Sequence, residues 1–423
     1  MPFSSVFWQI VLSFITILSA VALRGFVLAS PDGANGAQVV ELGRRNAVPV
    51  LYLQGSHYEV GFDQGRTFSS VIHAFVKRHF EMLPFEQEYA TEAGRAAYEK
   101  TLANMRQRYP WYVKEIQGIA DGAEIPFYKI FLLHCDDIVL TANDEHAPRP
   151  DHGGCTSIGI NTDDYAILGH NEDAFASTLN HWYIVSAHVT PTDEDRKHGA
   201  VDERYSSLCY AGHMPGYTMG FNEHGLVFSI NTLSPLRLKP GGTPRVFITR
   251  ALLTAKNFAE AEKIMRDDGL GAGNGFNINM IWSEPWGARR LYNAEVAPDL
   301  NARFSSISVR KYERDSLAHT NIYQNLNVTE VVGMIVDSSM ARLCAIQKHA
   351  PPQTRRDVAD ILSDAEGKTY SVWQNRPDAI VKTIATGIFD LEKRTWSMYI
   401  GKANETEPVA VLPIRFTRLN DVN

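Results

Sequence analysis

Cysteine is scarce in this sequence, which holds only four cysteines among 423 residues. No two of them form a Cys-x-x-Cys pair, so the sequence indicates neither a zinc site of that type nor a thioredoxin-like redox motif. The chain also lacks a long run of lysine or arginine, and its formal net charge is −7. We therefore expect no nucleic-acid partner, no bound metal and no cofactor. The cysteines are Cys135, Cys155, Cys209 and Cys344.

A glycine-rich loop of the nucleotide-binding type is missing as well. Residues 271–275, GAGNG, precede a strand-like run, whereas a phosphate-binding loop follows a strand and opens a helix. We interpret these residues as a turn. The overall composition, 44% hydrophobic and 21% charged, is that of a globular protein with enough apolar material for a sizeable core.

The N-terminus is predicted to carry a targeting signal. Residues 6–23 form an uncharged, mostly apolar run, and the triplet at residues 20–22 has the small-x-small pattern of a cleavage site. Two glycosylation sequons, at residues 327–329 and 404–406, suit a secreted chain. We expect residues 1–30 to be a signal peptide or signal anchor, and the protein to be secreted or tethered to a membrane through residues 6–23. A cytoplasmic protein is the alternative if the segment is not a functional signal.

The chain before residue 155 is predicted to be mostly helical. Residues 30–47 are polar and typical of a linker, and a short strand follows at residues 48–53. Ser56 and Glu59 have the spacing of a capping box, which marks a helix start. The polar stretch 141–153 contains prolines and indicates an exposed connection. Helices are expected over residues 58–82, 92–108, 110–122 and 126–140.

After residue 155 the pattern changes to strands rich in β-branched and aromatic residues. Helices are interspersed among them, and Asn257 with Glu260 has the spacing of a helix start. Runs of strands with helices before, between and after them predict the α+β class. Strands are expected at residues 182–189, 206–210, 217–222, 226–230, 276–282, 289–296, 384–390 and 395–400, and helices at 244–254, 257–269, 328–341 and 356–365.

One stretch has the residues for nucleophilic chemistry: residues 153–160, GGCTSIGI, in which two glycines precede a cysteine and a strand-like run. A second strand-like run, residues 165–173, follows after a turn, so the pair is predicted to form a β-hairpin with Cys155 at its start. If the bond between Gly154 and Cys155 is cut, the new α-amine can take the proton of the thiol. The reference pKa values, about 7.7–8.0 for the amine and about 8.5 for the thiol, are close enough for this exchange. From these residues alone, the alternative is a small buried cysteine after a Gly-Gly turn.

Further blocks extend this motif along the chain. They are GSHYEVGF at residues 55–62, GHNED at 169–173, GFNEHGLVFSIN at 220–231 and AHTN at 318–321. Together with GGCTS at residues 153–157, they make the chain resemble the acyl-coenzyme A:isopenicillin N acyltransferase family of N-terminal-nucleophile hydrolases, over roughly residues 48–410. The resemblance implies a four-layer αββα sandwich. It also implies self-cleavage into a helical propeptide or α subunit, residues 31–154, and a β subunit, residues 155–423, which stay associated.

The same resemblance assigns roles to individual residues. It implies that Cys155 is the nucleophile with its α-amine as base and that Asp173 holds the resulting α-ammonium. Asn231 and Asn321 are implied as donors to the oxyanion of the tetrahedral intermediate, although an asparagine at a strand end is more often a turn or cap residue. The chain departs from the related bile-salt hydrolases at His170, where they carry arginine. A role of His170 in tuning the thiol and a role as a packed imidazole are both open.

Residues 205–217 resemble the branch of this family that hydrolyses N-β-alanyl amines, such as N-β-alanyldopamine and β-alanyl-histamine, to β-alanine and the free amine. The implied protein is a self-processed cysteine amidohydrolase whose partner is a small N-acylated aromatic amine. Aromatic rings stack on such an amine, although aromatic residues in strands are more often part of the core. The candidate substrate-binding residues are His170, Tyr210, Tyr217 and Trp182.

Two other functions stay open at this point. The family name implies an acyltransferase, in which Cys155 forms a thioester and passes the acyl group to an amine acceptor, and no coenzyme A signature decides the matter. An unprocessed, non-catalytic binding protein would keep the fold but leave Cys155 blocked by Gly154. The carboxylate that recognises a β-alanyl ammonium is also open between Asp173, Glu172 and another carboxylate.

Overall fold

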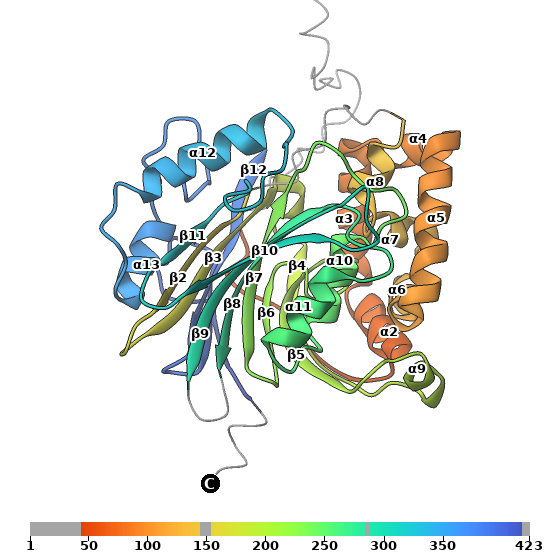
Figure 1. Ribbon diagram of the computed structural model, residues 1–423, viewed down its shortest axis with the longest axis horizontal. Helices are drawn as coiled ribbons and strands as arrows, with labels where there is room; N and C mark the ends of the chain where they lie inside the picture. The colour runs from red at the N-terminus through yellow and green to blue at the C-terminus, as the bar shows by residue number, and fades with distance from the viewer. Residues whose placement is uncertain (1–43, 144–153, 284–287, 417–423) are drawn as a thin grey trace, which may run out of the picture. The chain divides into compact units, whose positions relative to one another are not determined.

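The computed structural model describes residues 44–143, 154–283 and 288–416. Two β-sheets, one of eight strands and one of six, carry helices on their surfaces (Figure 1). The protein is therefore a mixed α and β structure, as the sequence predicts.

The helices before residue 155 begin at residues that favour helix starts. Ser56 closes the predicted capping box with Glu59, and Pro110 occupies a first helical turn, where its missing N–H costs no hydrogen bond. The prediction of one helix over residues 58–82 is wrong, because the chain breaks at Phe68 between two helices. The elements are β1 (Val50–Gly55), α2 (His57–Thr67), α3 (Ser69–Met82), α4 (Phe85–Ala90), α5 (Glu92–Arg108), α6 (Pro110–Ala123), α7 (Phe127–Leu132) and α8 (Asp136–Leu140).

The eight-stranded sheet is antiparallel except at one edge, where β1 pairs in parallel with its neighbour. Its strands follow in the order β1, β4 (Trp182–Val189), β5 (Glu203–Tyr210), β6 (Met219–Asn222), β7 (Leu226–Leu233), β8 (Gly275–Ser283), β9 (Arg289–Ala297) and β10 (Ser306–Tyr312). The register of β7 and β8 places Asn231 opposite Asn277. This pairing brings several asparagine side chains to one part of the sheet.

The six-stranded sheet is built around the predicted hairpin. Its strands follow in the order β11 (Leu317–His319), β2 (Thr156–Asn161), β3 (Ala166–Phe175), β12 (Val381–Asp390), β13 (Thr395–Tyr399) and β14 (Ala410–Pro413). Ser157 lies opposite His170 in the hairpin. On the other side of β3, Asp173 lies opposite Thr383, where a register shift interrupts the ladder.

The remaining helices connect the strands. Asn257 caps a helix as predicted, with its side chain accepting from Glu260 N. The predicted helix start at residue 328 is wrong, because the helix begins only after Gly333, whose φ of 132° ends the irregular segment before it. The elements are the 3-10 turn η1 (Ala176–Thr178), α9 (Asp193–Lys197), α10 (Arg245–Leu252), α11 (Phe258–Arg266), α12 (Met334–Ile346) and α13 (Arg355–Leu362).

Among the described residues, three large apolar cores and one small cluster hold these elements together. The first lies between the sheets and includes Leu168 and Ile184. The residue after Ile184, Val185, points to the opposite face of the sheet, because side chains alternate along a strand. Val185 packs in the second core, together with Ile116 and other residues of α2–α8, α10 and α11. The third core joins α12 and α13 to the six-stranded sheet through Val358 (Figure 1).

Among the described residues, no helix combines the length and the apolar character that a membrane span needs. The predicted signal segment, residues 6–23, lies outside the described part of the chain. The division of the chain between Gly154 and Cys155 stays a prediction.

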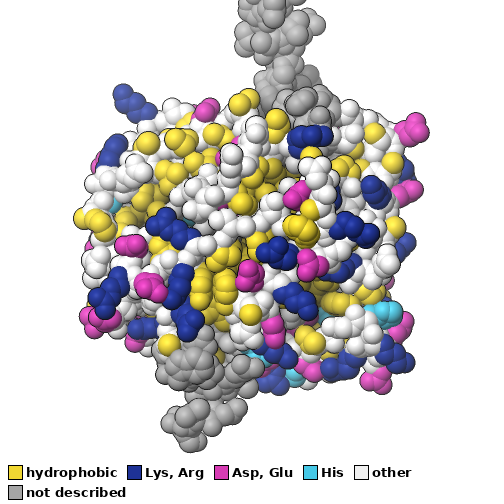
Figure 2. All heavy atoms as spheres, in the orientation of Figure 1, with side chains coloured by type: hydrophobic (Ala, Val, Ile, Leu, Met, Phe, Trp, Pro, Cys, Tyr) yellow, Lys and Arg dark blue, Asp and Glu magenta, His cyan; other side chains and the backbone are white. Residues whose placement is uncertain are grey.

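The face shown in Figure 2 carries charges of both signs. Lysine and arginine side chains are interspersed with aspartate and glutamate side chains there (Figure 2). No extended field of one sign therefore builds up over the described residues on that face.

Candidate functional site

Cys155 directly precedes β2 and is buried, with 6% of its surface exposed. Its Sγ donates a hydrogen bond to Glu172 Oε1 at 3.7 Å and lies 4.0 Å from the backbone oxygen of Asp173. The hairpin register explains the contact, because Thr156 pairs with Asn171 and the residues one step further along come face to face. The predicted nucleophile therefore lies beside two acidic residues.

Both carboxylate oxygens of Glu172 are held by neighbours. His170 Nε2 lies 3.0 Å from Glu172 Oε2, and the Tyr210 hydroxyl donates to Oε1. The other ring nitrogen, His170 Nδ1, lies 2.8 Å from Ser157 Oγ on the opposite strand. His170 and Glu172 share one face of β3, since they are two residues apart. A continuous hydrogen-bonded chain thus runs from the thiol through this pair to Ser157.

Asp173 lies on the other face of β3 and is incompletely paired. Its Oδ1 accepts a hydrogen bond from Thr383 Oγ1 at 2.5 Å, whereas Oδ2 is buried and has no hydrogen-bond partner among the described residues. Burial raises the pKa of Asp173 to about 7, and the charge of Arg342 offsets this effect only in part. Oδ2 is therefore a buried acceptor without a donor in the part of the chain that the structure describes, on a residue whose backbone oxygen lies next to the nucleophile.

Arg342, from α12, reaches the backbone around the nucleophile. Its guanidinium donates to Cys155 O at 2.5 Å, to Thr156 Oγ1 at 3.0 Å and to Asn321 Oδ1 at 2.9 Å. A Cβ on Gly154 would stand 2.5 Å from one guanidinium nitrogen, so glycine alone fits here without a shift of the arginine. Burial lowers the pKa of Arg342, and its hydrogen-bond partners are uncharged oxygens.

Asn231, on β7, is oriented by three donors to its carbonyl oxygen. Ser157 Oγ donates at 3.0 Å, Asn277 Nδ2 at 3.1 Å and Asn279 Nδ2 at 2.8 Å. Asn293 braces the two asparagines of β8 by donating to the oxygens of both. Because its oxygen is engaged, Asn231 presents its amide nitrogen on the other side, where its contact with a backbone oxygen of β11 is long, at 3.5 Å.

Asn321 follows β11 and lies next to this network. Its Oδ1 accepts from Arg342, and its Nδ2 donates to Thr232 O at 2.9 Å. Because arginine only donates, this contact fixes which end of the amide carries the oxygen. Thr232 directly follows Asn231, so both predicted oxyanion donors lie against the same piece of backbone. The four predicted catalytic residues thus belong to one connected set of contacts, and their roles stay predictions.

The surroundings of the thiol favour its protonated form. Burial raises the pKa of the Cys155 thiol well above its ordinary value, and the negative charges of Glu172 and Asp173 raise it further. The positive charge of Arg342 acts in the opposite direction but does not compensate. A thiolate therefore forms here only as its proton passes to an acceptor.

Three of the four predicted substrate-binding residues lie close to Glu172 and the thiol. His170 and Tyr210 both contact Glu172 beside the thiol. Tyr217 is half-buried and packs edge-on against Tyr210, with ring centroids 6.0 Å apart. Its hydroxyl lies 3.4 Å from Thr232 Oγ1, next to the predicted oxyanion donors. Stacking of these rings on a substrate stays a prediction.

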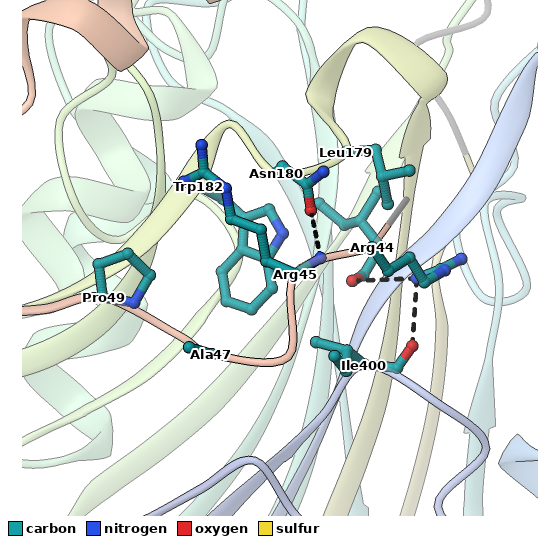
Figure 3. Close-up of a pocket in the computed structure, with 9 residues that line it drawn as sticks. Arg44, Arg45, Ala47, Pro49, Leu179, Asn180, Trp182 and Ile400 are labelled. Atoms are coloured by element: carbon teal, nitrogen blue, oxygen red, sulfur yellow. Dashed lines mark hydrogen bonds between the residues drawn. The ribbon is translucent and has the colours of Figure 1, made fainter. Parts of the chain in front are cut away.

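The fourth, Trp182, lines a small cavity beside the site (Figure 3). Arg44 enters this cavity and donates to the backbone oxygens of Ile384, at 3.4 Å, and Ile400, at 3.2 Å. Burial lowers the pKa of Arg44, while the negative charge of Asp173 raises it in part. Ile384 also lines the cavity, and it directly follows Thr383, whose hydroxyl donates to Asp173, so the cavity lies beside the acidic side of the site.

Among the described residues, one group has the donor types and spacing for a metal ion. Cys155, His170 and Glu172 are buried, and one ligand atom from each lies within 4.8 Å of the others. Thiolate, imidazole and carboxylate are all zinc ligands. The same atoms form the hydrogen-bonded chain from the thiol to His170, so an ion bound there would occupy the thiol as a ligand.

The sequence analysis did not select Arg342, Ser157 or the asparagines of β8. The sequence around Asn277 and Asn279 does contain a pattern that could have indicated a site. Polar residues two positions apart in a strand share one face, and they are unusual in a buried strand. Arg342 lies in a helix whose sequence has no distinguishing pattern around it. Its contact with Cys155 joins residues 187 positions apart, which spacing in the sequence does not reveal.

Comparison with known proteins agrees with the resemblance. The acyl-coenzyme A:6-aminopenicillanic acid acyl-transferase family matches residues 160–405, a range that contains Asn231, Asn321 and Arg342. The beta-alanyl-dopamine/carcinine hydrolase of Drosophila melanogaster is 42% identical over 386 residues, which make up 89% of this chain and 98% of that protein. The 40 kDa form of acyl-coenzyme A:6-aminopenicillanic-acid-acyltransferase of Emericella nidulans is 27% identical over 223 residues, 51% of this chain and 53% of that protein.

These matches confirm the family that the sequence motifs predicted. The family match extends over more than half of the chain, and the insect relative is similar along nearly its whole length. Both relatives are named as enzymes, one a hydrolase and the other an acyltransferase. This chain belongs to the acyl-coenzyme A:6-aminopenicillanic acid acyl-transferase family.

Proposed function

We propose that this protein is a self-processed cysteine amidohydrolase that cleaves N-β-alanyl amines, such as N-β-alanyldopamine or β-alanyl-histamine. The observation that carries the proposal is a buried thiol next to Asp173, whose Oδ2 has no hydrogen-bond partner among the described residues. Cleavage between Gly154 and Cys155 would create an α-ammonium that supplies the missing donor. The name of the insect relative, a beta-alanyl-dopamine/carcinine hydrolase, supports the substrate class.

In the cut form, the α-amine of Cys155 takes the thiol proton while Sγ attacks the carbonyl carbon of the β-alanyl amide. Asn231 and Asn321 donate hydrogen bonds to the oxyanion, and each such donor lowers the barrier by about 3–4 kcal/mol. When the C–N bond breaks, the α-ammonium returns its proton to the leaving amine, and the β-alanyl group stays on Cys155 as a thioester. Water then hydrolyses the thioester, with the α-amine again accepting a proton, and β-alanine is released.

We also propose the four-layer αββα arrangement of N-terminal-nucleophile hydrolases for this chain. The order of the cores supports it, since helices pack on each sheet and the sheets pack on each other. After cleavage, residues 31–154 and 155–423 stay associated. A buried ion network supports this association, because Glu115 precedes the cut, Glu203 and Arg250 follow it, and the arginine contacts both carboxylates at 2.6–3.1 Å.

Aromatic residues near the thiol support an aromatic leaving amine. Tyr217 stacks parallel to His213, with ring centroids 6.1 Å apart, and contacts Tyr210 edge-on. A catechol or imidazole ring would stack in the same orientation as these rings. We therefore expect this aromatic group to bind the amine side of the substrate.

An acyltransferase is the second candidate, because the Emericella nidulans relative is named as one. The chemistry up to the thioester is shared, and only the acceptor of the acyl group differs. In an acyltransferase, a thioester donor acylates Cys155 and an amine takes the place of water.

The test is an assay of wild type and Cys155→Ala with N-β-alanyldopamine and β-alanyl-histamine, in which mass spectrometry quantifies β-alanine and the free amine. We expect both products from wild type alone. If wild type hydrolyses neither substrate but transfers the β-alanyl group from β-alanyl-coenzyme A to dopamine, the protein is an acyltransferase and not a hydrolase. If wild type catalyses neither reaction yet binds the amides, the protein is a non-catalytic binding protein.

The secretory location is a separate proposal that rests on residues 1–30. Deletion of these residues from a tagged chain should move the protein from the membrane or secreted fraction to the cytosol. A full-length chain that is already cytosolic would contradict both the signal and the membrane tether.

A further inference from the structure

Self-cleavage needs a base other than the α-amine of Cys155, which serves as the base in the mature enzyme. Before the cut, the nitrogen of Cys155 belongs to a peptide bond, whose lone pair is delocalised and accepts no proton near neutral pH. The α-amine that serves later as the base does not yet exist. The buried thiol must therefore pass its proton to another group as it attacks the carbonyl of Gly154.

We propose that Glu172 is the catalytic base of self-cleavage and accepts the thiol proton on Oε1. The inference rests on the proposed function, because it presupposes the cut between Gly154 and Cys155. Glu172 Oε1 is the side-chain atom to which the thiol donates, at 3.7 Å, and the residue is 3% exposed. His170, 3.0 Å from Oε2, and the Tyr210 hydroxyl hold the carboxylate in this position. A base held in contact with the reacting atom and shielded from water is what general-base catalysis requires.

The neighbouring titratable groups are less suited to this role. Asp173 contacts the thiol only through its backbone oxygen, at 4.0 Å, and its carboxylate bonds to Thr383. His170 directs one ring nitrogen to Glu172 and the other to Ser157, so it acts on the thiol only through the glutamate. His170 is therefore a positioning residue.

The reaction balances with water as the single additional reactant. The S–H proton moves to Glu172 as the bond between Sγ and the Gly154 carbonyl carbon forms. The C–N bond then breaks, and Glu172 returns the proton to the departing nitrogen, which becomes the α-amine of Cys155. Water hydrolyses the resulting thioester, leaving a carboxylate on Gly154 and the regenerated thiol. Arg342 stays bonded to Cys155 O and fixes the backbone on the departing side.

The test is a pulse–chase measurement on the full chain made by cell-free translation, with intact mass reporting the rate of self-cleavage. Glu172→Gln keeps the size of the side chain but removes the base, so cleavage should slow at least about 100-fold, the typical contribution of a general base. Tyr210→Phe removes a contact that positions Glu172 but keeps the carboxylate, so self-cleavage should slow less than in Glu172→Gln. Cys155→Ala defines the uncut baseline.

Hydroxylamine separates formation of the thioester from its hydrolysis. It cleaves thioesters directly, so it should leave Glu172→Gln uncut if the glutamate acts before the thioester forms. Restoration of the wild-type rate by hydroxylamine would place Glu172 after that step and overturn the proposal.

The outcomes separate this proposal from the proposed function. An uncut wild-type chain overturns self-cleavage itself, whereas equal rates for wild type and Glu172→Gln overturn only the role of the glutamate. If thermal unfolding shows that Glu172→Gln does not fold, Glu172→Asp decides. The shorter side chain keeps a carboxylate but withdraws it from Sγ, so self-cleavage should still slow. A wild-type cleavage rate in Glu172→Asp overturns the proposal.

Discussion

Two buried ionic clusters of this protein are equally shielded from water but differ in how their charges are paired. The frame cluster consists of His57, Glu115, Glu203 and Arg250. The site cluster consists of Cys155, Glu172, Asp173 and Arg342.

In the frame cluster, the arginine contacts both carboxylates directly. Arg250 donates to Glu115 at 2.9 and 3.1 Å and to Glu203 at 2.6 Å. Burial alone would raise the pKa of Glu115, but the charge of Arg250 and the hydrogen bond of His57 outweigh it and lower the pKa to about 2. Glu115 and Arg250 are therefore arranged to stay ionised and to hold the structure together, because the pKa of the acid is lowered and that of the base is raised.

In the site cluster, the arginine hydrogen-bonds to uncharged oxygens instead. Burial raises the pKa of Asp173 to about 7 and that of Cys155 well above its ordinary value. Similar burial thus gives opposite results, and the difference lies in which groups Arg250 and Arg342 contact. Incomplete pairing of this kind is typical of sites that move protons.

The largest expected effect comes from removing the arginine of the frame cluster. In a Cys155→Ala background, which keeps the chain whole, Arg250→Met leaves two buried carboxylates with His57 as their remaining partner in the cluster. It should lower the free energy of unfolding by about 3–5 kcal/mol. Urea unfolding at pH 7 measures the loss. Arg196→Met, which removes an exposed ion pair with Asp202, is the matched control, with an expected loss below about 1 kcal/mol. Equal losses of unfolding free energy in Arg250→Met and Arg196→Met would contradict the stabilising role of the frame cluster.

A comparable effect on catalysis is expected at the oxyanion donors. Asn231→Ala should lower kcat for a β-alanyl amine by about 100–1000-fold, because one fixed donor to the oxyanion is lost. Asn279→Ala leaves that donor in place and disturbs only its orientation, so we expect a loss of about tenfold. Steady-state kinetics of the processed enzymes give both values. If Asn279→Ala is the more damaging of the two, Asn231 does not contact the reacting oxygen.

A smaller effect of opposite sign is expected at the poorly paired carboxylate. Asp173→Asn in the Cys155→Ala background should raise the free energy of unfolding at pH 8 by on the order of 2 kcal/mol, because the wild-type carboxyl must ionise in a site that disfavours its charge. The amide keeps a partner for Thr383. Urea unfolding of the two chains between pH 4 and 8 measures the difference.

The pH dependence has a definite sign for each cluster. The folded-state pKa of Asp173, about 7, lies above the unfolded value of about 3.9, so its contribution to stability is full below about pH 4 and is lost as the pH rises through 7. Glu115 has a folded-state pKa of about 2, so its contribution is full above about pH 4.3 and is lost as the pH falls toward 2. A gain from Asp173→Asn that is as large at pH 4 as at pH 8 would contradict this assignment.

The smallest expected effect concerns the residue before the cut. In Gly154→Ala, the new Cβ would stand 2.5 Å from a guanidinium nitrogen of Arg342, so the arginine must shift away from the backbone of Cys155. Self-cleavage should slow about tenfold, equivalent to about 1.4 kcal/mol in the barrier. Gly159→Ala is the control in the strand that follows, β2, because its Cβ would first meet the methyl ends of the Leu291 side chain at 3.1 Å. Its cleavage rate should stay within about twofold.

Local signals in the sequence predicted many elements of this fold. The helix expected at residues 92–108 has those bounds, and so does the strand expected at residues 182–189. Capping residues, proline positions and runs of β-branched residues act within a few positions, so a single sequence displays them. The edge strand β10 and the three-residue β11 were missed, since β10 is largely exposed and β11 is too short to show alternation.

The site was only partly predictable from the sequence, because many of its contacts join residues that are far apart in the chain. Cys155, Asp173, Asn231 and Asn321 were found through family motifs, and the structure joins them in one network of contacts that includes Arg342 and Ser157. The base proposed for self-cleavage follows from hairpin register, which a motif does not state. Arg342 reaches the site from a helix far along the chain, and a contact of that kind depends on the packing of α12 against the six-stranded sheet.

Self-cleavage between Gly154 and Cys155 is tested most directly by intact mass and N-terminal sequencing of the purified protein, with wild type beside Cys155→Ala. We expect wild type to separate into two fragments under denaturing conditions, one of which begins with Cys155, Thr156 and Ser157, while the variant stays whole. If wild type also stays whole, Cys155 has no free α-amine, and the proposed mechanism is contradicted.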